Sequence, residues 1–222
     1  MPQLYFIRHA QASIGHENYD QLSPLGHEQS EVLGRWWQSN GMQTGHVWSG
    51  SMVRHQQTLA GMHKHSILPP VCALPELNEY DFKAIISAYA AKFPDDENLK
   101  QGLWLQILKA AIVSWARDEI SADKLETWAD FQIRVSAALK RIMQTALTAQ
   151  QDALIVTSAG VMALVAQRSL GCDDAGLIGL NVALKNSAIC EYRLSKSGLS
   201  LQSFNTLPHL ADPALKRLQT RV

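Results

Sequence analysis

Short apolar runs of strand length alternate with helix-patterned segments along most of this chain, and this alternation limits the folds open to it. The runs occupy residues 4–7, 46–48, 152–157, 186–194 and 199–204, and the last two flank a turn at 196–198. Strands separated by helices favour a mostly parallel sheet with helices on both faces. With 222 residues, 46% of them hydrophobic, the chain can bury a sizeable core. The sequence predicts an α/β three-layer sandwich and a single domain over 1–222.

The first helix has clear start and stop signals. Ser23 can cap its N-terminus, Pro24 suits the first turn, and Gly41 lies past the end. Its expected apolar face carries Val32, Leu33 and Trp36.

The alternation stops between residues 83 and 127, where two helical stretches are separated by residues 93–96. Apolar residues recur at helical spacing in the second stretch, at Trp104, Ile107, Leu108, Ala111, Ile112 and Trp115. This spacing is typical of a packed helix. The segment is therefore expected to be a helical insertion.

The first apolar run ends in Arg8 and His9, which places a guanidinium beside an imidazole at a strand end. Ligands of open α/β sheets bind at the carboxyl ends of strands, and such a pair suits an anion. Arg54 follows the second run, in the first turn of an expected helix. A cation there opposes the helix macrodipole unless an anion lies between it and the helix amides. After Pro75, the segment 77–82 carries Glu79 and Asp81, and one of these carboxylates could serve as a general acid.

Five short motifs occur in the order found in the histidine phosphatase superfamily, or phosphoglycerate mutase-like family, which the chain resembles nearly end to end. Residues 8–11 resemble its Arg-His-Gly-Glu/Gln, 22–26 its Leu-Thr-x-x-Gly, and 49–58 its Ser-x-x-x-x-Arg-x-x-x-Thr. Residues 77–79 resemble the stretch that holds the proton donor, and 205–210 the C-terminal Asn-x-x-x-His-Leu.

The resemblance implies a phosphomonoester hydrolase that works through a phosphohistidine intermediate and uses no metal or other cofactor. His9 would be the nucleophile, Arg8 and Arg54 would bind the phosphoryl oxygens, and Glu79 would protonate the leaving oxygen. The family's insertion at 83–127 forms a cap over the pocket. The expected partner is a small phosphomonoester, whose identity stays open, as does the oligomeric state.

Two residues depart from the family pattern. Ala10 stands where Gly is usual, and Ser158 occupies the position of the second catalytic histidine. A hydroxyl is a weaker donor than a charged imidazole, and losing one donor to a developing oxyanion costs about 10² to 10³ in rate. Ser158 can still donate one hydrogen bond from a helix N-terminus, so it is expected to bind phosphate together with Arg8 and Arg54, with reduced turnover.

Several residues are candidates for accessory roles in the resembled site. Gln11 and His209 are candidate accessory residues, and His16, His55 or His209 could replace the missing imidazole. A surface or loop role is the simpler interpretation of each histidine.

Three alternatives remain open. The first is a phosphate-binding module that has lost turnover, and the second is a mutase. The third is a serine hydrolase in which Ser158, Asp173 or Asp174, and His209 supply the nucleophile, acid and base in that order.

Composition argues against several other classes. The 20 basic and 20 acidic residues cancel, and there is no basic stripe, so nucleic acid is not an expected partner. No apolar run approaches a membrane span. The metal motif His-Glu-x-x-His and the pair Cys-x-x-Cys are missing. Three widely spaced cysteines favour reduced thiols and a cytoplasmic location.

Overall fold

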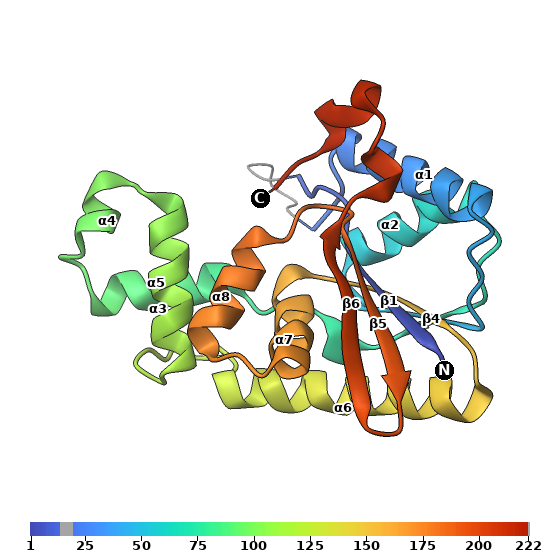
Figure 1. Ribbon diagram of the computed structural model, residues 1–222. Helices are drawn as coiled ribbons and strands as arrows, with labels where there is room; N and C mark the ends of the chain where they lie inside the picture. Colours follow the sequence, from blue (N-terminus) through green and yellow to red (C-terminus); the bar gives the residue numbers. More distant parts are fainter. Residues whose placement is uncertain (14–19, 222) are drawn as a thin grey trace.

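The computed structural model describes residues 1–13 and 20–221. Within this part of the chain, six strands form one sheet in the order β3-β2-β4-β1-β5-β6 (Figure 1). The strands are β1 (Gln3–Arg8), β2 (His46–Ser49), β3 (Val71–Ala73), β4 (Ala153–Thr157), β5 (Ile189–Ser195) and β6 (Gly198–Thr206). The first four pair in parallel, whereas β5 and β6 pair antiparallel. The predicted mostly parallel sheet is confirmed, and the hairpin forms at the predicted turn.

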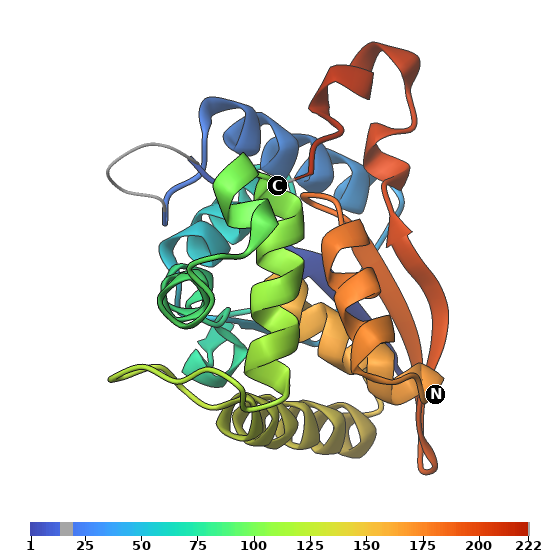
Figure 2. The same ribbon diagram turned by 90° about the vertical axis from the view of Figure 1, so that its left-hand side faces the viewer.

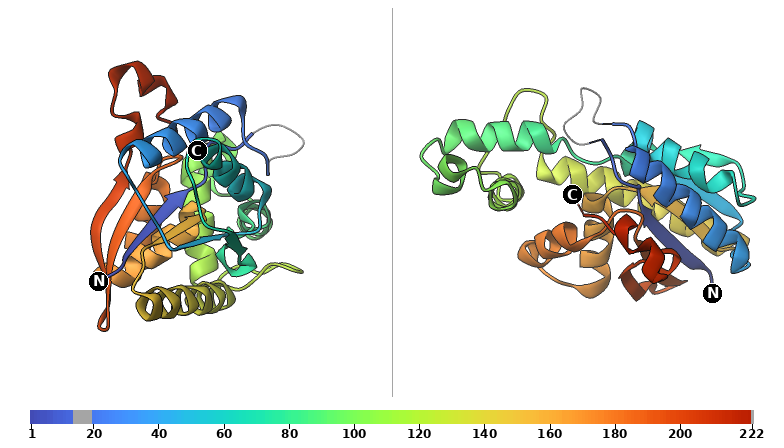
Figure 3. Two further views of the ribbon diagram at one scale, coloured as in Figure 1. Left: turned by 90° about the vertical axis from the view of Figure 1, so that its right-hand side faces the viewer. Right: turned by 90° about the horizontal axis from the view of Figure 1, so that it is seen from above.

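Helices fill the intervals between the strands and cover both faces of the sheet (Figures 1 and 3). They are α1 (Pro24–Ser39), α2 (Val53–His63), α3 (Phe82–Lys92), α4 (Glu97–Gln101), α5 (Trp104–Ala116), α6 (Trp128–Ala149), α7 (Ala159–Leu170) and α8 (Asp174–Ala183), with 3-10 turns η1 (Pro75–Leu77), η2 (Pro208–Leu210) and η3 (Pro213–Leu218). No helix of the described chain is both long and apolar enough to cross a membrane.

The first helix begins as predicted. The Ser23 hydroxyl accepts a hydrogen bond from the Gly26 amide at 3.0 Å, and Gly41 adopts a left-handed conformation past the helix end. The predicted apolar face needs one correction, because Trp37 is the fully buried tryptophan and Trp36 is only partly buried.

Alternation along the central strands divides the core into two layers. In β1, Leu4 and Phe6 pack on the face that also receives α5, α6 and α7, whereas Ile7 packs with α1 and α2. In β4, Ile155 belongs to the first layer and Val156 to the second. Figure 3 shows helices on both sides of the sheet, which gives the three layers predicted from the sequence.

The insertion between β3 and β4 contains α3, α4 and α5, where the sequence predicted two helical stretches. The additional helix, α4, is a single short turn that begins at Asp96, whose side chain accepts from the Asn98 and Leu99 amides. In α5, Ile107 and Ile112 are buried, as the predicted stripe requires. Figures 1 and 2 show these helices to one side of the sheet, with α5 upright beside it.

The carboxyl ends of three adjacent strands meet at one edge of the sheet. Arg8 pairs with Thr157 in the parallel register, and the His9 amide donates to the Thr157 carbonyl at 2.8 Å. The Gly50 amide, just after β2, donates to the Val156 carbonyl at 3.1 Å. This edge therefore brings together residues that follow β1, β2 and β4.

Candidate active site

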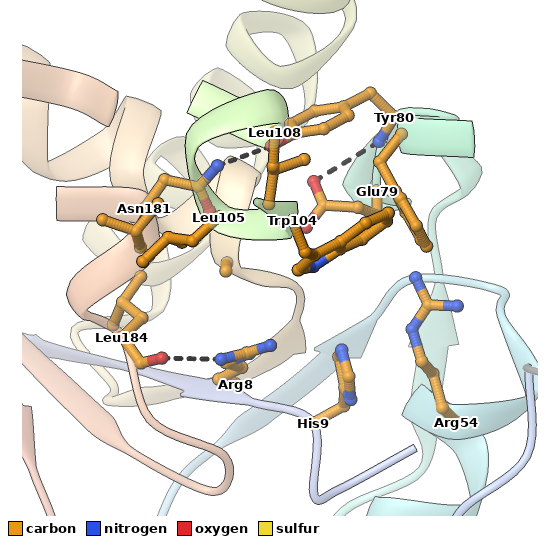
Figure 4. A pocket seen from close by; sticks show the side chains of 13 residues that line it. Arg8, His9, Arg54, Glu79, Tyr80, Trp104, Leu105, Leu108, Asn181 and Leu184 are labelled. Atoms are coloured by element: carbon orange, nitrogen blue, oxygen red, sulfur yellow. Dashed lines mark hydrogen bonds between the residues drawn. The ribbon is translucent and has the colours of Figure 1, made fainter. Parts of the chain in front are cut away.

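A pocket lies over this edge, with polar side chains on its floor and apolar side chains from the insertion opposite them. Its cavity is about 150 Å³ and is lined by Arg8, His9, Arg54, Glu79, Tyr80, Phe82, Trp104, Leu105, Leu108, Ala159, Asn181, Val182 and Leu184. Figure 4 shows the His9 ring standing between Arg8 and Arg54, with Glu79 and Trp104 facing it. The four residues that the sequence singled out for phosphate chemistry thus share one pocket.

The contacts of His9 fix which ring nitrogen is available for attack. Its Nδ1 lies 2.8 Å from the Ala10 carbonyl oxygen. A carbonyl can only accept, so Nδ1 carries the proton and Nε2 keeps its lone pair. Burial, together with the charges of Arg54 and Arg8, holds the pKa of His9 well below its usual range. The imidazole is therefore neutral at neutral pH, as a nucleophile must be.

Ala10 and Thr58 connect the nucleophile to helix α2. The Ala10 amide donates to the Thr58 hydroxyl at 3.0 Å, and that hydroxyl donates to the Arg54 carbonyl at 2.7 Å. Since both residues are fully buried, these bonds fix the spacing between His9 and Arg54.

Both guanidinium groups are held in place by the surrounding protein. Arg8 donates through Nη1 to the Leu184 carbonyl at 2.6 Å. Arg54 donates through Nη1 to Asp20 Oδ1 at 2.8 Å, and the other oxygen of Asp20 accepts from the Val53 amide at 2.9 Å. An anion was expected between Arg54 and the helix amides, and the Asp20 carboxylate of the same chain takes this place. No motif in the sequence had pointed to Asp20.

Glu79 is directed at the start of helix α7. One carboxyl oxygen accepts from the Gly160 amide at 3.0 Å and the other from the Tyr80 amide at 3.3 Å. A Cβ at position 160 would lie 2.3 Å from the carboxyl oxygen of Glu79, so only glycine leaves room for this approach. Burial raises the pKa of Glu79, and the amide bonds and nearby arginines only partly oppose it. A raised pKa suits a general acid.

The segment that carries Glu79 is anchored by Arg134 of α6. This arginine donates to the Glu76 and Asn78 carbonyls at 2.9 and 2.7 Å, and it pairs with both oxygens of Glu126 at 2.7 and 2.6 Å. The Asn78 side chain also accepts from the Ser51 amide at 2.7 Å. The acid is thus tied to both α6 and the loop before α2, contacts that no sequence motif indicated.

Ser158, which was expected to bind phosphate with Arg8 and Arg54, lies beside the pocket but does not line the cavity. It is fully buried, and its Oγ is 2.7 Å from Nε2 of the equally buried His55. The rings of His55 and His9 have centroids 5.7 Å apart. Two of the three histidines that could replace the missing imidazole lie in the described part of the chain, and of these two His55 is the one at the site.

The two candidate accessory residues make their contacts elsewhere. The Gln11 side chain accepts from the Ser23 hydroxyl at 2.8 Å, and His209 Nε2 lies 2.9 Å from the Ser187 hydroxyl. Neither residue lines the cavity, so the expectation that they contribute to the pocket is not met. His16 lies outside the residues that the structure describes.

The predicted serine hydrolase triad is not assembled. The histidine bonded to Ser158 is His55 and not His209, and Asp173 accepts from the Gly176 amide at 2.8 Å as the cap of α8. The order of the three residues along the chain was therefore misleading.

The wall opposite the floor is apolar and belongs mainly to the insertion. Phe82, Leu105 and Leu108 face the cavity together with Trp104. Trp104 and Leu105 are 48% and 47% exposed, so the wall presents apolar surface to solvent. Within 1–13 and 20–221, no cluster of three or more histidine, cysteine or acidic side chains is arranged to hold a metal ion.

Comparison with known proteins gives a family match and several structural neighbours. The family model of the histidine phosphatase superfamily (branch 1) matches residues 4–207. A putative alpha-ribazole-5'-P phosphatase from Escherichia coli superposes with a TM-score of 0.68 at 20% identity, covering 92% of this chain and 96% of that one. A search of curated protein sequences returns no match.

Two further solved structures have the same fold. Phosphoglycerate mutase from Bacillus anthracis has a TM-score of 0.69 at 16% identity, with 94% of each chain covered. Phosphoserine phosphatase from Entamoeba histolytica in complex with phosphoserine has a TM-score of 0.66 at 15% identity, with 95% of this chain and all of that chain covered.

Proposed function

Because the chain belongs to the histidine phosphatase superfamily, branch 1, we propose that it hydrolyses phosphomonoesters through a phosphohistidine formed on His9. The observation that supports this function best is the state of His9. A neutral imidazole, whose Nδ1–H donates to the Ala10 carbonyl, presents Nε2 between the side chains of Arg8 and Arg54. The two guanidinium groups would balance the charge of a phosphoryl group during transfer.

In the first step, Nε2 of His9 attacks phosphorus, and the bond between phosphorus and the ester oxygen breaks. Glu79 gives its proton to the departing oxygen, which leaves as an alcohol. The raised pKa of Glu79 keeps a protonated fraction available for this transfer.

In the second step, a water molecule attacks the phosphohistidine, and the phosphorus–nitrogen bond breaks. The Glu79 carboxylate takes a proton from that water, which restores the acid. His9 regains its lone pair and inorganic phosphate leaves, so the enzyme returns to its starting state.

The wall opposite the floor indicates which alcohols the pocket suits. Trp104, Leu105, Leu108 and Phe82 surround the space that the ester group would enter. Burial of apolar surface stabilises a complex by about 25 cal/mol per Å². We therefore propose substrates whose phosphorylated group is apolar or aromatic, in preference to small polar phosphates.

A panel of phosphomonoesters tests this function. Phosphate release would be measured for aryl and alkyl phosphates and for glycerol phosphates, and a rapid acid quench and an alkaline quench would be compared for labelled phosphoenzyme. We expect release that is fastest with aryl esters, and a phosphoenzyme that is acid-labile and stable to alkali. Transfer of the phosphoryl group to a second hydroxyl instead of water would indicate a mutase. Orthophosphate binding without phosphoenzyme or release would indicate a binding module.

A further inference from the structure

His55 and Ser158 form a buried polar pair directly behind the nucleophile, and the mechanism above uses neither. Both side chains are fully buried, and their Nε2 and Oγ atoms are 2.7 Å apart. They come from different elements, α2 and the start of α7, and are 103 residues apart in the chain. Burying an imidazole and a hydroxyl carries a desolvation cost that apolar residues at these positions would avoid.

The space around His55 fits its ring closely. A Cβ at Gly50 would lie 2.2 Å from the His55 Nδ1 atom and 2.6 Å from Cε1, so any larger residue at position 50 would collide with the ring. Arg54, the adjacent residue in α2, lines the cavity. The imidazole is thus placed by the same helix turn that carries the phosphate-binding guanidinium.

Ser158 does not behave as an ordinary helix cap. A serine at this position usually accepts a hydrogen bond from an amide in the first helical turn, but the Ser158 side chain makes none. The Gly160 amide, which could have been its partner, donates to Glu79 instead. The hydroxyl instead hydrogen-bonds His55 of α2, at the end of the strand that pairs with β1.

We propose that His55 is a positioning residue that acts through Ser158, and that the pair supplies the hydrogen bond to the transferring phosphoryl group that a single histidine at position 158 would supply. This inference rests on the proposed phosphatase function. When His55 carries a proton on Nε2, it donates to the Ser158 oxygen, and the hydroxyl is then free to donate its own proton to a phosphoryl oxygen near His9.

The electrostatics of the pair support a role linked to anion binding. Burial and the charge of Arg54 lower the pKa of His55 to about 3, so the ring is neutral before a ligand binds. A bound phosphate dianion offsets the charge of Arg54, and this change favours proton uptake by His55. The cavity ends at Ala159, the residue next to Ser158, so a small movement at the start of α7 brings the hydroxyl to a bound phosphoryl group.

The geometry also leaves room for one imidazole only. A histidine at position 158 would extend into the space that the His55 ring occupies, because the Ser158 oxygen is already 2.7 Å from that ring. Ser158→His alone should therefore overpack the site. Combining His55→Ala with Ser158→His should relieve this crowding. The site would then hold a single imidazole, carried by residue 158 in place of residue 55.

The test compares kcat and KM for an aryl phosphate in His55→Ala, His55→Gln, Ser158→His and the double variant. We expect kcat to fall by about 10-fold to 10²-fold in His55→Ala, with little change in KM, since one hydrogen bond to the developing charge is misplaced. His55→Gln, which can still bond the hydroxyl, should lose less. The double variant should exceed both His55→Ala and Ser158→His by about tenfold.

Met62→Ala is the matched control for loosening α2. Met62 lies on the same helix and is fully buried in the layer between the sheet and α1. The Met62→Ala variant should have a lower melting temperature than the wild type, with kcat within about threefold of the wild-type value.

The wild-type protein tests the proposed function separately from this inference. If it releases no phosphate, the affinity for orthovanadate is measured in the same variants, and the same ranking is expected. An unchanged kcat or vanadate affinity in His55→Ala, or a double variant no better than the worse single variant, would overturn the role of His55.

Discussion

The floor and the wall of the pocket are built in different ways. On the floor, Arg8, His9 and Arg54 are each 3% exposed and bond to backbone or side-chain groups of the sheet and its adjoining segments. On the wall, Trp104 and Leu105 are about half exposed, and α5 is fixed by its opposite face. The groups to which we assign the chemistry thus sit on the most constrained part of the fold. The groups to which we assign substrate choice sit where a change costs the fold little.

The largest expected effect is on the floor, from His9→Ala. Removing the nucleophile should lower kcat by at least about 10³-fold and abolish the phosphoenzyme, because no other group can take its role in the first step. Steady-state phosphate release measures kcat, and labelling after an alkaline quench measures the phosphoenzyme. Orthophosphate binding and the melting temperature show whether the variant is folded. Retained turnover in a folded variant would remove His9 from the mechanism.

Glu79→Gln should have the next largest effect, a loss of about 10² to 10³ in kcat for esters with poor leaving groups. The loss should be smaller for p-nitrophenyl phosphate, whose oxygen needs no proton. Since burial raises the pKa of Glu79, kcat/KM of the wild type should fall as pH rises through that pKa. The variant should lack this alkaline limb. If the limb persists in Glu79→Gln, another group is the acid.

Acid should destabilise the floor side of the molecule. Burial lowers the pKa of His9 well below its usual range, and those of His55 and His209 to about 3. The unfolded chain therefore binds protons below about pH 6.5 that the folded chain does not bind, and folding free energy is lost as pH falls. Each histidine should cost about 1 kcal/mol between pH 6.5 and 5.5.

Glu79 acts in the opposite direction, because its raised pKa favours the folded state until pH rises through that value. The stabilisation that Glu79 contributes does not outweigh the loss from the three histidines. Urea denaturation at several pH values measures how the free energy of unfolding depends on pH. In His55→Gln, the slope of this free energy against pH should decrease by the contribution of one histidine. The insertion from 82 to 116 contains no histidine, so the wall contributes nothing to this slope. A stability that does not change over this pH range would contradict the burial of these rings.

The smallest expected effect is on the wall. Trp104→Ala should raise KM for aryl phosphates by about tenfold or less and leave kcat nearly unchanged, because it removes contact area that ground state and transition state share. Glycerol phosphate should respond little. Leu103→Ala is the control, since Leu103 is also apolar and 37% exposed but does not line the cavity. A large fall in kcat would mean that Trp104 also shapes the chemistry.

The sequence predicted the floor better than its supports. Arg8, His9 and Arg54 could be found because a strand end and a helix start are readable from local pattern, and parallel strands bring such ends to one edge. Glu79 followed from the family resemblance. For α1, the capping signals at Ser23 and Gly41 were enough to place both ends.

The supports depend on contacts between distant segments, which no local pattern encodes. Asp20 reaches Arg54 across 34 residues, and His55 reaches Ser158 across 103. The role of Arg134 could not be predicted for the same reason, because it binds backbone carbonyls, which every residue has and which the sequence does not distinguish. The short edge strand β3 also went unpredicted, because its three apolar residues, Val71 to Ala73, form a run shorter than a typical strand.

The amide of His9 donates to Thr157, so the pairing of β1 with β4 continues one residue past the strand end and includes the nucleophile itself. In deuterated solvent this amide should exchange only when the sheet opens, whereas amides in α4 and the first turn of α5 should exchange through local fraying. A compound that loosens the insertion would then alter which esters enter while the attacking nitrogen stays in register with the sheet.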